Sequence, residues 1–164
     1  MRARVIFGGL LLVVAALVGL VVRKEQILAH GTPVLLELAP VDPRSLIQGD
    51  YMVLDYAVSR EVRPADGAGA EEGRLVLRLD ENGVGRFVRR DEPGTPLGPG
   101  ELPLRYKVRK GRVRLGAESF FFQEGHANRY ARAKYGELRV AGDGSSVLVG
   151  LRDAERQPLG RAVP

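Results

Sequence analysis

The chain of 164 residues carries 25 basic and 20 acidic side chains, for a formal net charge of +5, and no cysteine. Residues 1–30 hold four basic groups and one acidic group, whereas residues 31–164 hold 21 and 19, a net charge of only +2. Because much of the positive balance lies at the N-terminus, the composition does not support a nucleic-acid-binding protein. The length leaves room for one domain after an N-terminal segment.

The first predicted element is a membrane-spanning helix over residues 5–22, eighteen residues without a charge. Such a helix is about 27 Å long, close to the roughly 30 Å hydrocarbon core of a bilayer. Arg2 and Arg4 precede the apolar run, and Arg23 and Lys24 follow it. A cleavable signal peptide is the alternative, but its apolar core is usually shorter and ends at small residues. We therefore predict an uncleaved anchor with its juxtamembrane turn over residues 1–30, and a polar domain over residues 31–164.

The orientation of the anchor cannot be read from charge alone, since each flank carries two basic residues. A short N-terminal tail before a long C-terminal domain is typical of a signal anchor whose tail stays in the cytoplasm. We expect a single-pass protein of the cytoplasmic (inner) membrane, with an extracytoplasmic, periplasmic C-terminal domain. Small residues within the run, Gly8, Gly9, Ala15, Ala16 and Gly19, would allow close approach of another helix.

The helix is predicted to continue over residues 23–30 and to end at Gly31-Thr32-Pro33. Residues 34–38 form a predicted strand, and residues 40–49 a turn region. Residues 51–58 alternate as a second strand, and we predict that one face is buried. That face carries Met52, Leu54, Tyr56 and Val58.

Two hairpins are predicted after a surface loop at residues 64–73. The first joins residues 74–80 to 84–90 through Asn82-Gly83, the preferred pair for a type I′ turn. Residues 91–100, rich in proline and glycine, form an irregular connection. The second hairpin joins residues 104–109 to 112–115 around Lys110-Gly111.

The last third of the chain predicts a short buried strand, one short helix and a final hairpin. Residues 120–122 are three phenylalanines, and residues 126–135 are helix-like, with Gly136 as a left-handed cap. Residues 137–140 and 147–152 flank a glycine-rich turn. The predicted fold class is therefore mostly β: a transmembrane helix followed by a compact antiparallel β domain with one short helix.

Residues 49–56, GDYMVLDY, match the pattern G-D-Y-x-x-L-x-Y at every fixed position. The chain resembles the bacterial GDYXXLXY family, and similar segments at residues 42–44, 121–125 and 136–151 extend the resemblance over nearly its whole length. This resemblance implies a membrane-anchored companion of a multi-pass membrane protein, without an established biochemical activity.

The motif also has a physical interpretation. Leu54 and Tyr56 belong to the predicted core face, whereas Tyr51 points the other way, with its hydroxyl at a rim. Gly49 supplies backbone freedom, and Asp50 beside it is a typical turn former. A functional alternative is that Asp50 acts alone or with Glu124, either binding a cation or serving as acid and base.

Other catalytic patterns are weak. Residues 45–50, SLIQGD, resemble a segment of type I signal peptidases, but Val41 occupies the position of the nucleophilic serine. His30 and His126 are the only histidines and lack metal-ligand spacing. We therefore expect no enzyme, no cofactor and no metal site, with a hydrolase using Asp50 and Glu124 as the less favoured alternative.

Charge is uneven along the predicted β domain. Residues 31–73 carry a net charge of −5, and residues 74–114 a net charge of +6. The basic residues of 105–114 would share a strand face, either as a solvated or protective edge strand or in contact with lipid headgroups. We expect a non-enzymatic interaction module, an accessory subunit of a multi-pass membrane protein. A domain that binds a small ligand or an envelope polymer is the alternative.

Overall fold

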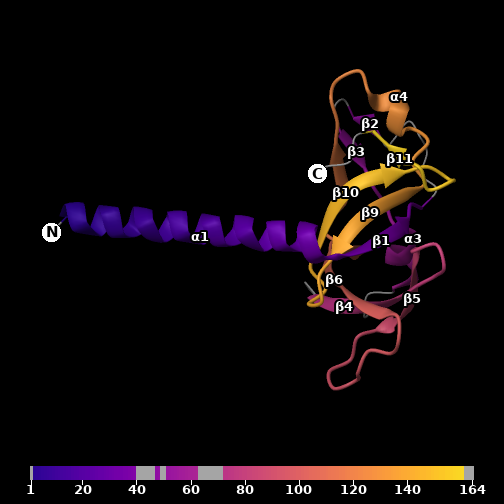
Figure 1. Cartoon of the computed structure of the whole chain (residues 1–164), viewed down its shortest axis with the longest axis horizontal. Coiled ribbons are helices and arrows are strands. Elements are labelled where there is room, and N and C mark those ends of the chain that lie inside the picture. The colour runs from indigo at the N-terminus through magenta and orange to yellow at the C-terminus, as the bar shows by residue number, and fades with distance from the viewer. Residues whose placement is uncertain (1, 40–46, 49–50, 63–71, 161–164) are drawn as a thin grey trace.

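The computed structural model describes residues 2–39, 47–48, 51–62 and 72–160. A long N-terminal helix, α1 (Arg2–His30), projects from a β-rich region that comprises the rest of the described chain (Figure 1). The β-rich region is elongated, and its long axis is roughly perpendicular to α1. One of its long sides therefore faces the N-terminal part of the helix. The predicted class, mostly β after an apolar helix, is confirmed.

Three antiparallel sheets form the β-rich region. One sheet has the order β1 (Thr32–Glu37), β9 (Tyr135–Val140), β10 (Ser146–Arg152), β11 (Pro158–Leu159). The second, the motif sheet, has the order β2 (Ile47–Gln48), β3 (Tyr51–Val53), β8 (Ser119–Phe121). The third, the basic sheet, has the order β5 (Gly85–Arg90), β4 (Glu72–Leu79), β6 (Glu101–Arg109), β7 (Arg112–Arg114). Two short helices, α3 (Ala57–Glu61) and α4 (Ala127–Tyr130), complete the described elements.

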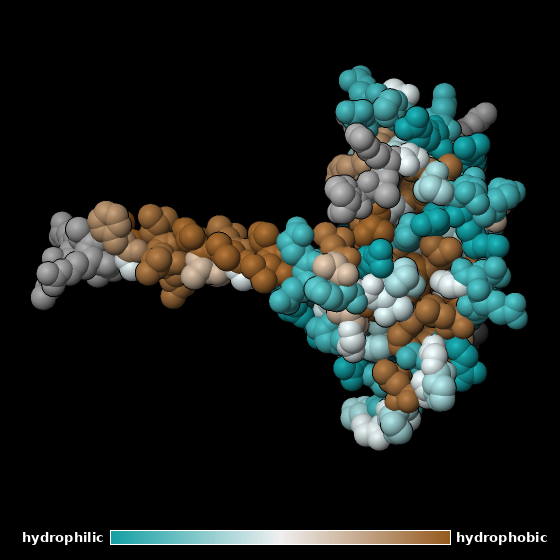
Figure 2. All heavy atoms as spheres, viewed as in Figure 1, coloured by the Kyte–Doolittle hydropathy of each residue, from teal (hydrophilic) through white to brown (hydrophobic). Residues whose placement is uncertain are grey.

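Helix α1 is long and apolar enough to cross a membrane over residues Ile6–His30. Its apolar side chains from Ile6 to Val22 are exposed, as the brown rod in Figure 2 shows, whereas Ile27 is buried against the β-rich region. The helix ends where predicted: the Gly31 amide donates to the Ile27 carbonyl at 2.8 Å. A Cβ at Gly31 would lie 2.4 Å from that oxygen, so a larger residue there would disturb the junction.

The predicted strand over residues 51–58 is shorter than expected. Strand β3 ends at Val53, and residues 57–61 turn into α3. The predicted buried face is nevertheless confirmed, because all four of its members are buried. Val58 reaches the core from one turn of helix rather than from a strand, a change of backbone that side-chain alternation does not reveal.

Both central hairpins are confirmed, but the type I′ turn predicted at Asn82-Gly83 is not. Among the described non-glycine residues, positive φ occurs at Lys110 and Arg156 but not at Asn82. The Asp80 carboxylate instead accepts hydrogen bonds from the Asn82 and Val84 amides and closes a longer loop. The pair with two positive φ angles, the mark of a type I′ turn, is Lys110-Gly111.

Two predictions near the C-terminal end are wrong. Gly136 is not a helix cap: it lies in β9, and the preceding helix is the single turn α4. A Cβ at Gly136 would lie 2.9 Å from Tyr56 Cε1, so close ring packing explains the glycine. The triple phenylalanine is not buried either, because Phe121 in β8 is 73% exposed.

Candidate functional site

The described part of the motif is residues 51–56. Its side chains lie on both faces of β3 and in the segment that follows this strand. Gly49 and Asp50 lie outside the described residues, so the turn-forming role predicted for them is not addressed. Leu54 and Tyr56 are buried in the shared hydrophobic core, as predicted. Tyr51 lies on the opposite face, also as predicted, and is half-buried.

Tyr56 is a structural residue that links two sheets. Its hydroxyl donates to the Ala117 carbonyl at 2.7 Å, and Ala117 lies between β7 of the basic sheet and β8 of the motif sheet. Burial raises the pKa of the Tyr56 phenol far above its ordinary value, and the negative charge of Glu118 adds to this. The hydroxyl therefore stays protonated and acts as a hydrogen-bond donor to the Ala117 carbonyl.

The outer face of the motif sheet carries two aromatic side chains, together with Val53 and the exposed Ser119 opposite it. Tyr51 lies directly opposite Phe121 in the pairing of β3 with β8, and their ring centroids are 5.7 Å apart. Val53, two residues along β3, is 38% exposed. We call Tyr51, Val53 and Phe121 the aromatic face. The exposed part of this face, mainly Phe121, contributes little to folding.

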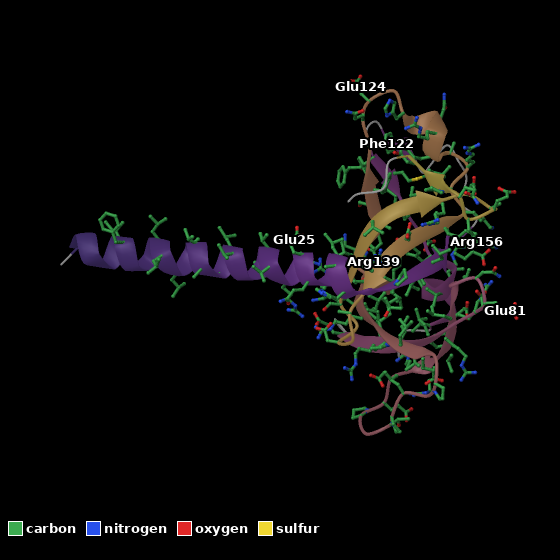
Figure 3. The ribbon with its side chains drawn as sticks, viewed as in Figure 1. Glu25, Glu81, Phe122, Glu124, Arg139 and Arg156 are labelled. Carbon is green, nitrogen blue, oxygen red and sulfur yellow. The ribbon has the colours of Figure 1, made fainter. Side chains whose placement is uncertain are left out.

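Glu124 is exposed and lies in the segment between β8 and α4. Figure 3 shows it near Phe122, at one end of the β-rich region. Its predicted partner, Asp50, lies outside the described residues, so their proximity is not tested. Within the described segments, no group of three or more His, Cys, Asp or Glu side chains could hold a metal ion. Both histidines are exposed, His30 at the end of α1 and His126 before α4.

An ion-pair cluster fixes the end of α1 to the β-rich region. Arg23, the first charged residue after the apolar run, contacts Asp143 Oδ2 at 2.8 Å, and Arg105 of β6 contacts the same oxygen at 3.0 Å. Asp143 lies in the β9–β10 turn and also accepts hydrogen bonds from the amide and hydroxyl of Ser145. These bonds, led by the one from the Ser145 amide, lower the pKa of Asp143.

Sequence reasoning missed this cluster. It identified residues 142–145 as a turn, but nothing in the local pattern indicated that the turn meets a residue 120 positions earlier. A second contact supports the same junction, since the Arg139 side chain donates to the Gly31 carbonyl at 3.3 Å. The helix is therefore held at the β-rich region by charged groups immediately below its apolar length.

The basic residues of β6 and β7 share one face, as predicted. Along β6, Arg105, Lys107 and Arg109 are exposed and alternate with the buried residues Tyr106 and Val108. The edge-strand interpretation is confirmed for β7, at the edge of this sheet, but is wrong for β6, which lies between β4 and β7. The basic side chains line an open groove of about 380 Å³.

Residues 13–151 match the family described as GDYXXLXY protein, which covers most of the chain. The chain belongs to this family. No curated protein and no solved structure matches it.

Proposed function

We propose that this protein is a single-pass membrane protein that acts as a non-enzymatic binding module for a multi-pass membrane protein. Helix α1 anchors it in the cytoplasmic membrane, with the N-terminus in the cytoplasm and the β-rich region outside. The aromatic face of the motif sheet contacts the partner. In this proposal Leu54 and Tyr56 of the motif have no catalytic part, because both are buried in the core.

The observation that carries the proposal is the docked end of α1. The apolar length of the helix ends at Val22, and the next residue, Arg23, already contacts Asp143 in the β9–β10 turn. No linker separates the apolar length from the β-rich region. A membrane-inserted α1 therefore holds this region at the bilayer surface, where a partner embedded in the same membrane is within reach.

The aromatic face supplies the contact chemistry. Aromatic residues are enriched at the centres of protein–protein interfaces, where they bury large area at a low cost in conformational entropy. Phe121 gains little from folding, since most of its surface stays in solvent. Burial against a partner would remove the apolar surface of Phe121 from water and so contribute to the free energy of binding.

Orientation is tested by placing a single cysteine in the full-length chain, which has none of its own. We expect Thr95→Cys, in the exposed connection between β5 and β6, to react with an impermeant thiol reagent on whole cells, after permeabilisation of any outer membrane. Labelling that requires lysis of the inner membrane would show the opposite orientation.

The partner is tested by crosslinking in cells followed by gentle detergent extraction of the full-length protein. We expect one dominant integral membrane protein, whose recovery falls at least severalfold for Phe121→Ala but not for Val88→Ala. Val88, 39% exposed, is an apolar side chain on β5 of the basic sheet and lies outside the aromatic face. Replacing residues 6–22 with an unrelated leucine-rich span tests whether α1 contributes.

Recovery of only monomer or self-dimer under several crosslinkers would contradict the partner proposal. Equal losses for Phe121→Ala and Val88→Ala would contradict the assignment of the aromatic face. The ligand-binding alternative would then become the better explanation of the exposed surfaces.

A further inference from the structure

The groove on the basic sheet has an unusual charge arrangement. In the pairing of β6 with β7, Lys107 lies directly opposite Arg114, and Arg109 lies directly opposite Arg112. All four side chains are on the exposed face of their strands. Like charges at directly opposed positions of an antiparallel pair are destabilising, so this pattern opposes folding of the isolated chain.

Only part of this positive charge is balanced within the protein. Arg105 is paired with Asp143, and Lys107 with Glu72. Arg109, Arg112 and Arg114 form no ion pair with any residue in the described parts of the chain. These guanidiniums therefore lack a partner of opposite charge at contact distance among the described residues.

The one carboxylate that lines the groove is already engaged. Glu118 Oε1 accepts hydrogen bonds from the Leu115 amide and, at 2.9 Å, from the Gly116 amide. It supports the turn after β7, where Gly116 has a φ of +81°. The groove thus presents guanidinium and ammonium groups beside the buried Tyr106, and its one acid serves the backbone.

The groove begins next to the end of α1. Arg105, which lines it, shares the Asp143 carboxylate with Arg23 of the helix. Figure 1 shows β4 and β6 beside the C-terminal end of α1, and Figure 2 shows hydrophilic residues gathered around the point where the apolar rod meets the β-rich region. If α1 spans the bilayer, as the proposed function requires, this position is the headgroup layer.

We propose that the groove binds the headgroup of an anionic phospholipid from the membrane that holds α1. Guanidinium groups match the geometry of phosphate oxygens and form charge-assisted hydrogen bonds with them. Arg109 and Arg114 are the principal ligands of the phosphate. The bound lipid neutralises the opposed cations and orients the β-rich region on the bilayer.

The test is native mass spectrometry of the full-length protein in detergent, titrated with phosphatidylglycerol or with phosphatidylcholine of the same chain length. We expect wild-type protein to retain phosphatidylglycerol in preference to phosphatidylcholine. Arg109→Gln with Arg114→Gln should weaken phosphatidylglycerol binding about tenfold. Arg109→Lys with Arg114→Lys keeps the positive charge and should weaken phosphatidylglycerol binding less.

The matched control is Arg129→Gln with Arg132→Gln, which removes the same two charges from exposed positions at and just after α4. We expect it to bind phosphatidylglycerol like the wild type. Equal weakening in the control, or none in the groove variant, would overturn the site. Inorganic phosphate that displaces the lipid at comparable concentration would assign the groove to a free anion and overturn the lipid proposal.

Membrane anchoring is measured separately, by resistance of each variant to alkaline carbonate extraction. Failure of the wild type to retain phosphatidylglycerol, with its anchoring intact, counts against the groove alone. Loss of anchoring in the wild type counts against the proposed function. Thermal unfolding in detergent verifies that each glutamine variant folds.

Discussion

The motif sheet and the basic sheet lie on either side of the end of α1 and differ in their outer faces (Figure 1). Their inner faces meet in one core: Met52 of the motif sheet and Leu77 and Leu104 of the basic sheet belong to one buried cluster. The outer face of the motif sheet is aromatic, with Phe121 largely exposed, whereas the outer face of the basic sheet places cations opposite cations. Neither outer arrangement favours folding, and each supports one of the two proposals made above.

The largest expected effect separates the inner from the outer face of the motif. Leu54→Ala empties a fully packed position, 2% exposed, and should lower the free energy of unfolding by about 2–5 kcal/mol. Val53→Ala, its neighbour on the outer face, should change it by less than about 0.5 kcal/mol. Urea unfolding of the full-length protein in detergent, followed by circular dichroism, measures both. Equal stability of the two variants would break the distinction between the faces.

A second effect concerns Tyr56, whose ring packs where the sheets meet. Gly136→Ala would place a Cβ 2.9 Å from Tyr56 Cε1 and should destabilise the protein by about 1–3 kcal/mol through overpacking. Gly142→Ala is the control, because a Cβ there has no described neighbour within 4 Å. A shift in the unfolding midpoint for Gly136→Ala no larger than for Gly142→Ala would disprove the close packing.

A smaller effect concerns the junction that sets both sheets beside α1. The pKa of Asp143 is lowered in the folded protein, mainly by the Ser145 amide, so its stabilising contribution is present above the ordinary aspartate range. It is lost as the pH falls through the lowered folded pKa. Because Arg23 and Asp143 are both partly exposed, we expect less than about 1 kcal/mol.

The measurement for this junction is the distance between spin labels at Glu25→Cys and Gly142→Cys. The distribution of this distance should broaden at acid pH in the labelled protein that retains Asp143. It should already be broad at neutral pH when Asp143→Asn is added. A distribution that is narrow and identical in all cases would show that the junction does not depend on the Asp143 charge.

The smallest effect is expected for Phe121→Ala, within about 0.5 kcal/mol, because this side chain is mostly in solvent. Phe120→Ala is the contrasting variant: its ring packs edge-on against Tyr130, with centroids 5.0 Å apart. Phe120→Ala should lower the midpoint of thermal unfolding clearly more than Phe121→Ala does. A large loss for Phe121→Ala would mean that the aromatic face serves folding and would remove it as a partner surface.

Much of the fold could be predicted because its signals are local. The hairpins around residues 80–84 and 110–111 follow from alternation and turn residues, and the buried face of the motif follows from its period of two. Turn geometry could not be predicted for Asn82, because the Asp80 carboxylate competes successfully for the backbone amides. The exposure of Phe121 was also missed, since hydrophobicity alone does not tell which face of β8 meets the core.

The sequence by itself determined the apolar helix, its end at Gly31 and the alternation of strand faces, because each depends on neighbours within a few residues. Tertiary structure alone decided the contact of Arg23 with Asp143, the packing of Gly136 on Tyr56, and the position of the basic groove beside α1. Such contacts join residues far apart in the chain. Their geometry depends on how the sheets pack against one another, which no local pattern encodes.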